Sequence, residues 1–207
     1  MGVRRRQKSL EVRKAEHAEI TDPSLVLEAC LRFLEARARS AAEVRRRLLL
    51  HGYRADLVEG AIERLTELGM IDDAAFASAW VESRDRARPR GERALRQELR
   101  VKGIDRAVID DVIEAREGAA ADRDPEGDVD GDTGDDPMSA DDAAAHRLLT
   151  RHARALERVV DPRARRQRAY ALLARNGFSP ETCSRLASAT VVAVLDPADD
   201  AQADASP

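Results

Sequence analysis

The stretch Leu48–Tyr53, LLLHGY, has two counterparts later in the chain, LRVKGI at Leu99–Ile104 and LARNGF at Leu173–Phe178. In each copy a leucine is followed four residues later by a glycine, and then by a large side chain that can close a core. Glycine adopts the left-handed conformation that stops a helix without the steric cost that a Cβ atom imposes. We therefore predict three short helices, each of which ends at one of these glycines.

The residues around the first copy predict two further helices, one on each side of the short one. Asp22 followed by Pro23 marks a helix start, and apolar residues then recur at helical spacing. Ser40 with Glu43 three residues later has the form of a capping box and starts the short helix. A third apolar stripe follows, so residues 23–70 form a predicted three-helix repeat.

The same pattern recurs around the other two copies, which makes the chain a repeat protein. The first two glycines are 51 residues apart and the last two are 74 apart. The difference of 23 residues nearly equals a run rich in Asp, Gly and Pro, which has too few apolar residues to offset the entropy of ordering. The predicted fold class is all-α: an elongated tandem array of three three-helix repeats, with a disordered acidic insertion before the third repeat. The predicted segments are a mobile basic arm (1–22), repeat 1 (23–70), repeat 2 (71–116), an acidic linker (117–139), repeat 3 (140–195) and an acidic tail (196–207). If the arm contains a helix, we expect it near Ile20.

Charge is distributed unevenly along the chain. The formal net charge is −4, but residues 117–142 carry eleven acidic residues and one Arg, and residues 196–207 carry four Asp and no base. The remaining residues have a net charge of +10, and residues 143–195 alone have +7. A basic body of this kind favours phosphate or an acidic protein as partner. The acidic insertion is interpreted either as a solubilising linker or as a tethered polyanion, and both interpretations stay open.

Arginine clusters lie on or just before the second helix of each predicted repeat. Arg93, Arg96 and Arg100 follow helical spacing, so they are expected to share a face and to offer bidentate donors to phosphate or carboxylate groups. The alternative for every cluster is a solvated helix face without a ligand. The candidate partner-binding and DNA-binding residues are Arg45, Arg46, Arg47, Arg88, Arg90, Arg93, Arg96, Arg100, Arg163, Arg165, Arg166 and Arg168.

Catalytic and metal-binding functions find little support in the sequence. The four histidines are scattered, without the paired spacing of a metal site or a neighbouring catalytic acid. Cys30 and Cys183 have no CxxC partner and are expected to be small core residues in a reducing compartment. Asp128-x-Asp130-x-Asp132 lacks the glycine and the glutamate that a calcium loop needs. We therefore expect a protein that is not an enzyme, without catalytic residues, metal or cofactor.

Two acidic and two aromatic residues have structural interpretations. Asp72 and Asp73 precede an amphipathic helix, which favours helix capping over acid–base chemistry. Phe76 and Trp80 lie four residues apart and are expected to pack in the core rather than stack on bases.

Secretion and membrane insertion are not predicted. The chain has no run of about 18 apolar residues, and residues 1–20 are charged throughout instead of carrying an apolar signal region. We expect a cytoplasmic protein that contacts no membrane, and we expect it to be a monomer.

Two groups of residues carry a resemblance to a known family. Gly69–Ala77, GMIDDAAFA, together with Arg84, Gly91, Leu95, Leu99 and Lys102-Gly103-Ile104, resembles the RecX family. Repeat 1 resembles the same family at Leu31, Leu34, Arg37, Ser40, Glu43, Val44 and Leu48. These motifs cover residues 25–115, whereas repeat 3 matches more loosely and the arm and acidic segments have no counterpart. The resemblance implies a stack of three-helix units that binds the RecA recombinase, lies along the groove of its filament on DNA, and restrains its strand-exchange and ATPase activities. It implies no catalytic residue.

The leading hypothesis is therefore a regulator of RecA filaments in homologous recombination, DNA repair and the SOS response, with single-stranded DNA contacted directly or through the filament. The alternative is a helical-repeat protein that binds nucleic acid independently of RecA, which a steep salt dependence on naked DNA would indicate. A third class is an α-solenoid adaptor for another acidic protein.

Overall fold

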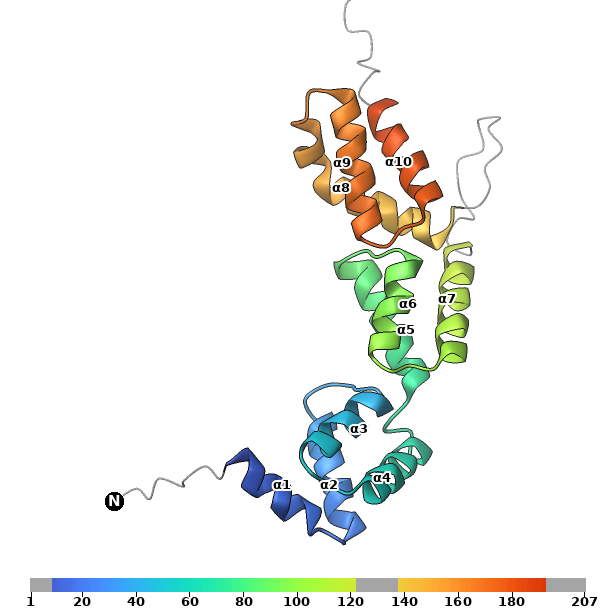
Figure 1. Cartoon of the computed structure of the whole chain (residues 1–207). Helices are drawn as coiled ribbons and strands as arrows, with labels where there is room; N and C mark the ends of the chain where they lie inside the picture. The colour runs from blue at the N-terminus through green and yellow to red at the C-terminus, as the bar shows by residue number, and fades with distance from the viewer. Residues whose placement is uncertain (1–8, 122–137, 193–207) are drawn as a thin grey trace, which may run out of the picture. The chain divides into compact units, whose positions relative to one another are not determined.

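The structure is a computed structural model that describes residues 9–121 and 138–192, and within them it contains ten helices and no strand (Figure 1). The predicted all-α class is confirmed. The helices are α1 (Leu10–Ala18), α2 (Pro23–Leu34), α3 (Ala41–Leu50), α4 (Ala55–Glu67), α5 (Asp73–Ala87), α6 (Glu92–Val101), α7 (Arg106–Ala121), α8 (Ala140–Glu157), α9 (Pro162–Arg175) and α10 (Pro180–Val192). Helices α2–α4, α5–α7 and α8–α10 correspond to the predicted repeats and are called repeats 1, 2 and 3. In the same residues no helix combines the length and the apolar character that crossing a membrane requires.

The chain divides into two compact units, and the division does not follow the repeats. Unit 1 consists of Met1–Val81 and Glu98–Val112, and unit 2 consists of Glu82–Gln97 and Ile113–Pro207. Repeat 2 is shared between the units, because the division passes through α5, α6 and α7. Repeats and compact units are thus different divisions of the same chain.

The core of unit 1 is formed where α2, α3 and α4 pack against one another. Val26, Val44 and Val58, one from each helix, are completely buried. Cys30 is buried in the same cluster, as predicted. Each fully buried side chain of valine size or larger contributes roughly 1.5–3 kcal/mol. The burial of apolar side chains from all three helices, and not any single contact, therefore holds these helices together.

The core of unit 2 lies between α8, α9 and α10. Ala145 on α8, Leu173 on α9 and Cys183 on α10 are completely buried. Phe178, which follows the third glycine, is also buried in this cluster. The large side chain after the glycine therefore closes the core of this repeat, as the repeat pattern predicts.

The three repeated glycines stop their helices in the predicted way. Gly52, Gly103 and Gly177 have φ angles of 92°, 77° and 85°. In each turn the amide of the residue after the glycine donates to the carbonyl of the leucine that opens the motif, over 3.2, 3.1 and 3.4 Å respectively. This six-residue closure satisfies a carbonyl at the helix end and explains the fixed spacing of leucine and glycine.

The turn around Gly103 docks repeat 2 on repeat 1, and all residues of this first junction belong to unit 1. Ser40, the fully buried N-cap of α3, donates through Oγ to the carbonyl of Lys102 over 2.7 Å. Asp73 accepts a 2.9 Å hydrogen bond from the amide of Ala41, the first residue of α3. Gly103 lies directly against the Cβ of Ala42, which leaves no room for a side chain.

A second junction, between repeats 2 and 3, lies entirely within unit 2 and repeats this arrangement with other residues. The amide of Gly91, just before α6, donates to the carbonyl of Asn176 over 3.0 Å. Asp141 accepts from the amide of Glu92, the first residue of α6, over 3.0 Å. A Cβ atom on Gly177 would lie 2.6 Å from the backbone nitrogen of Ala94. The carbonyl before the glycine and an acidic residue of the following repeat thus have the same roles at both junctions.

Helix α1 makes the corresponding contacts with the first glycine turn. The Nδ1 atom of His17 donates to the carbonyl of His51, the residue before Gly52, over 2.7 Å. A Cβ atom on Gly52 would lie 2.6 Å from the carbonyl oxygen of Lys14. The His17 ring stacks on Tyr53, with ring centroids 4.2 Å apart. Helix α1 therefore takes the place that the second helix of a preceding repeat would occupy.

This docking differs from the mobile arm predicted for residues 1–22. Residues 10–18 are helical, and Ser9 caps them by accepting from the amide of Val12 over 3.3 Å. A helix towards the end of this segment agrees with the sequence analysis, but its docking is not evident from the sequence, because the contacts with His51 and Tyr53 lie more than thirty residues away. Residues 1–8 lie outside the described residues.

Both ends of the predicted acidic linker, residues 117–139, belong to the fold of unit 2. Helix α7 continues to Ala121, where a run of alanines favours helix. Glu117 accepts a 2.9 Å hydrogen bond from the amide of Ala140, and Ser139 is the N-cap of α8. Residues 122–137, with the calcium-like motif, and the acidic tail lie outside the described residues.

Candidate partner and nucleic-acid interface

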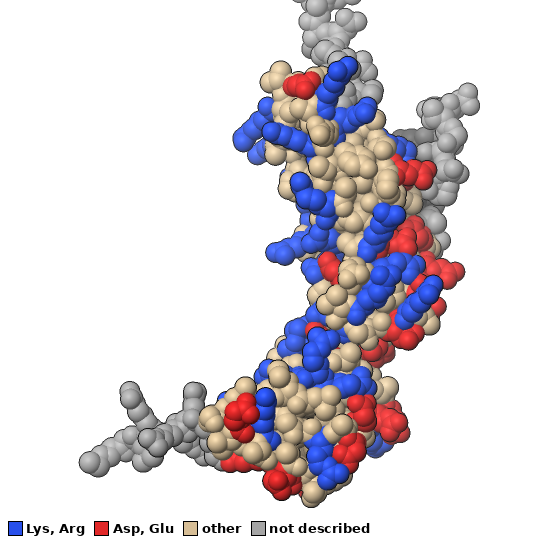
Figure 2. Space-filling model, viewed as in Figure 1, with Lys and Arg blue, Asp and Glu red and all other residues tan. Residues whose placement is uncertain are grey.

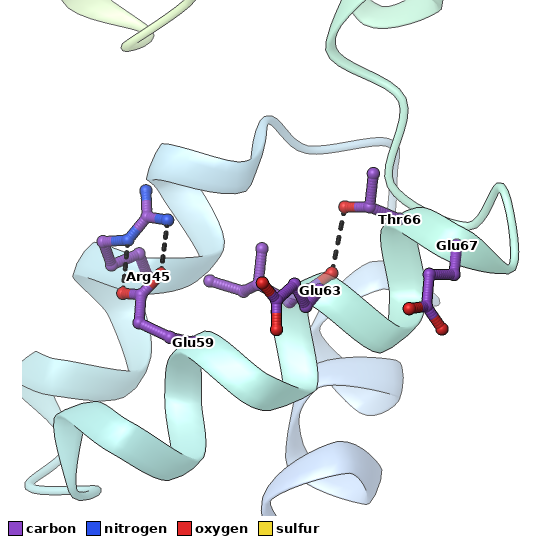
Figure 3. Close-up of a pocket in the computed structure, with 6 residues that line it drawn as sticks. Arg45, Glu59, Glu63, Thr66 and Glu67 are labelled. Carbon is purple, nitrogen blue, oxygen red and sulfur yellow. Dashed lines mark hydrogen bonds and ion pairs between the residues drawn. The ribbon is translucent and has the colours of Figure 1, made fainter.

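The predicted arginines of α3 differ in how much of their hydrogen-bonding capacity remains available. Arg45 donates from two nitrogens to both carboxylate oxygens of Glu59 on α4, each over 2.6 Å (Figure 3). This bidentate pair lowers the pKa of Glu59, chiefly through the hydrogen bond from Arg45. Arg46 is exposed and lies 3.5 Å from the carbonyl of Val101. Arg45 is thus already satisfied by the fold, whereas Arg46 is largely free to meet a ligand.

A hollow of about 420 Å³ adjoins Arg45 between α3 and α4 (Figure 3). Its other lining residues are Glu59, Ile62, Glu63, Thr66 and Glu67. Three carboxylates against one paired guanidinium make this hollow unfavourable for phosphate. The basic contacts of unit 1 must therefore lie elsewhere.

Arg47, a predicted site residue, lies beside Arg39, which is not among the predicted site residues. Its guanidinium carbon lies 5.6 Å from the centroid of the Phe33 ring. Arg39, from the loop before α3, lies over the same ring at 4.4 Å. The sequence signal is Arg37-x-Arg39 directly before the Ser40 cap, but the ring that joins the two helices in space is not evident from it.

Glu43, an acidic residue of α3, pairs with two further cations of unit 1, Lys102 and Arg37. Lys102 lies 2.7 Å and Arg37 3.6 Å from Glu43 Oε1. Burial alone would raise the pKa of Glu43, but the hydrogen bond and charge of Lys102 and the charges of Arg37 and Arg39 lower it below its usual value. Glu43 therefore stays ionised and neutralises one of these positive charges.

The predicted arginines around α6 are divided between structural and exposed positions. In unit 2, Arg90 donates to the side-chain oxygen of Asn176 over 2.8 Å, and Arg96 pairs with Glu92 over 2.5 Å. Arg88 and Arg93 are exposed. Arg100, which belongs to unit 1, is also exposed. The shared face expected for Arg93, Arg96 and Arg100 therefore includes one arginine already bound to a carboxylate.

The α9 cluster of unit 2 contains three exposed arginines and one buried arginine. Arg165 is only 8% exposed and donates to the carbonyl of Val159 over 3.1 Å, so its role is structural. Arg163, Arg166 and Arg168 are exposed, and their guanidinium groups form no ion pair or hydrogen bond with another described residue. Figure 2 shows basic side chains gathered around the α8–α9 turn of unit 2.

Arg116 is a buried arginine of unit 2 that the sequence interpretation missed. Its side chain is 5% exposed and donates to both carboxylate oxygens of Asp85, over 2.9 and 3.0 Å, and to Asp141 over 2.7 Å. It also reaches the carbonyls of Arg90 and Ala140. Burial raises the pKa of Asp141 even though Arg116 opposes this. Arg116 thus joins repeats 2 and 3 and is not available to a partner.

The predicted structural residues are placed largely as expected. Asp72 caps its own helix by accepting from the amide of Ala75 over 2.8 Å, whereas Asp73 caps α3. Phe76 is buried. Trp80 is half-buried and donates to Glu98 over 2.8 Å, with Lys102 4.6 Å from its ring centroid.

Comparison with known proteins identifies the family. Residues 27–65 match the first three-helix domain of RecX, and residues 72–113 match its second three-helix domain. The regulatory protein RecX of Mycobacterium ulcerans is 32% identical over 167 residues, which cover 81% of this chain and 85% of that protein. The RecX proteins of Mycolicibacterium vanbaalenii and Mycobacterium avium are 46% and 45% identical over shorter segments, which cover 41% and 46% of this chain. The chain spans about half the length of these two relatives, 46% and 54%.

Two solved structures share the fold. A crystal structure of regulatory protein RecX has a TM-score of 0.61 at 22% identity, covering 77% of this chain and 70% of that one. RecX from Lactobacillus salivarius has a TM-score of 0.58 at 19% identity, covering 84% of this chain and 96% of that one. With the repeat architecture and the sequence match along most of its length, the chain belongs to the RecX family of regulatory proteins.

Proposed function

We propose that this protein binds RecA recombinase filaments on DNA and inhibits their ATPase and strand-exchange activities during recombination and repair. The observation that carries the proposal is the match to a regulatory protein RecX along 81% of the chain. The exposed arginines of both units support it, because guanidinium groups bind both carboxylates and phosphates with paired donors. The protein acts by occupying the filament and not by chemistry of its own, and it does so as a cytoplasmic monomer.

A titration of RecA ATPase activity on single-stranded DNA tests this function. Full-length protein is added to preformed filaments, and the expected result is a saturable fall in ATP hydrolysis together with co-sedimentation of the protein with the filaments. Strand exchange between homologous DNA molecules should fall over the same concentration range. Unchanged ATP hydrolysis at saturating protein, with no co-sedimentation, would reject the proposal.

The second candidate function is direct binding of nucleic acid without RecA. The observation that favours it is the exposed group Arg163, Arg166 and Arg168 in a segment, residues 143–195, with a net charge of +7. Strong binding to naked DNA that weakens steeply with salt, and that RecA does not increase, would favour this function over the first.

A further inference from the structure

Phe33 holds two arginines of unit 1 that come from different segments. Arg39 lies in the loop between α2 and α3, and Arg47 lies one turn before the end of α3. Their guanidinium carbons are 4.4 and 5.6 Å from the same ring centroid, so the two cations are at most 10.0 Å apart. Phe33 itself is half-buried and packs against the core of unit 1. The core therefore fixes the position of the ring that holds both charges.

Arg39, which is half-buried, and the exposed Arg47 differ from two other arginines of unit 1. Arg54 pairs with Asp56 over 2.7 Å, and Arg64 pairs with Glu67 over 2.8 Å. Neither Arg39 nor Arg47 forms an ion pair or a guanidinium hydrogen bond with another described residue, and Arg39 Nε is buried without an acceptor there. When an aromatic ring holds a guanidinium group, the N–H groups stay available for hydrogen bonds, because the ring attracts the positive charge without accepting those hydrogens.

Two cations this close repel each other, since their separation does not exceed the Debye length of about 10 Å in 0.1 M salt. Arg37 and Lys102 add two further positive charges near Glu43, which supplies one negative charge. The five side chains Arg37, Arg39, Glu43, Arg47 and Lys102 thus have a net charge of +3. An anion between Arg39 and Arg47 would relieve this repulsion and supply acceptors to their donors.

We propose that Arg39, Phe33 and Arg47 form a binding site for the phosphate backbone of single-stranded nucleic acid. A guanidinium plane on an aromatic ring presents its edge to phosphate oxygens and its outer face to a base, which is how single strands are held without sequence preference. An acidic protein surface would bind the edges of the guanidinium groups but would not stack on their faces. This proposal rests on the proposed function, in which the protein acts on single-stranded DNA. It adds a direct contact between that DNA and repeat 1.

The test measures binding of the full chain to a fluorescently labelled oligothymidine of about 30 nucleotides, without RecA, by fluorescence anisotropy at several salt concentrations. The variant is Arg39→Gln/Arg47→Gln. The control is Arg54→Gln/Arg64→Gln, which removes the same number of charges from the same unit but breaks existing ion pairs. Circular dichroism verifies that each variant keeps the helix content of the wild type.

Loss of two phosphate contacts should reduce the slope of log affinity against log salt by about 1.4. When the salt concentration rises fourfold, the factor by which affinity falls should consequently be about seven times larger for the wild type than for the Arg39→Gln/Arg47→Gln variant. The control variant should keep the wild-type slope. Phe33→Leu keeps both charges and the apolar contact with the core, so it should weaken binding without changing the slope.

Equal slopes for the wild type and the Arg39→Gln/Arg47→Gln variant would overturn the proposal, as would absence of binding to the oligonucleotide at low salt. An equal slope change in the control would also overturn it, because the effect would then follow net charge and not this site. If the double variant does not fold, Arg47→Gln alone, at an exposed side chain, should give half the slope change. The assay contains no RecA, so its failure is distinguishable from failure of the RecA titration.

Discussion

Replacing Arg116 with Met removes a buried guanidinium and keeps an apolar side chain of similar length in its place. In the wild type this guanidinium donates to Asp85 twice and to Asp141 once, and it also reaches two backbone carbonyls. The substitution leaves two carboxylates that are 23% and 15% exposed without their principal counter-charge. Removing one partner of a buried ion pair typically costs about 3–5 kcal/mol. We expect the free energy of unfolding at pH 7 to fall by about this amount.

Urea denaturation followed by circular dichroism measures this loss, and pH provides an independent check on its cause. Burial already raises the pKa of Asp141, and without Arg116 that pKa should rise further. A carboxyl group whose pKa is higher in the folded state favours folding less as pH rises through that pKa. The deficit of Arg116→Met should therefore be largest near pH 7 and shrink as pH falls towards about 4.

A second substitution separates charge from packing. In Arg116→Met/Asp141→Asn, the amide oxygen of the new side chain can still accept from the Glu92 amide, but no charge remains at that position. We expect the double variant to recover at least half of the lost stability. A loss below about 1 kcal/mol for Arg116→Met, or a deficit that does not change with pH, would refute the reasoning.

Three further results are expected. Gly103→Ala should cost about 2–4 kcal/mol, from the left-handed backbone and the collision with Ala42, whereas Gly60→Ala, at a helical position with open space, should be neutral or stabilising; equal urea midpoints for the two variants would contradict this. Burial and nearby positive charges lower the pKa of His51, so stability should fall as pH drops from the ordinary histidine value of 6.5 towards the lowered pKa, and the melting temperature of His51→Gln should fall less between pH 7 and pH 5. Burial raises the pKa of Cys30 to about 11, so iodoacetamide should modify it slowly in the native protein at pH 8 and much faster in denaturant, as mass spectrometry of the labelled peptide would reveal.

The local part of the fold could be predicted from the sequence because its signals are local. The leucine–glycine spacing encodes a helix end and its closing hydrogen bond within six residues. The capping residues Ser40 and Asp72 likewise act within three residues of their own positions. Helix periodicity then identifies the buried stripes without knowledge of what covers them.

The contacts that join the repeats could not be predicted in the same way. Asp73 appears in the sequence as the cap of its own helix, but it accepts from the amide of Ala41, which lies 32 residues earlier. Arg165 and Arg166 are neighbours in one arginine run, yet only Arg165 is buried. The Arg39–Phe33–Arg47 site also depends on packing between two segments. In each case the environment is set by an element distant in the chain, and periodicity carries no information about it.

The two junctions have a consequence for how proteins of this architecture can change in length during evolution. Repeat 2 carries both halves of a connection: a helix start that receives repeat 3, and a glycine turn that fits against repeat 1. An in-frame duplication of repeat 2 would therefore insert a segment already equipped to join its neighbours on both sides. Helix α1, which fits the first glycine turn, indicates that such a turn also accepts a helix from outside a repeat.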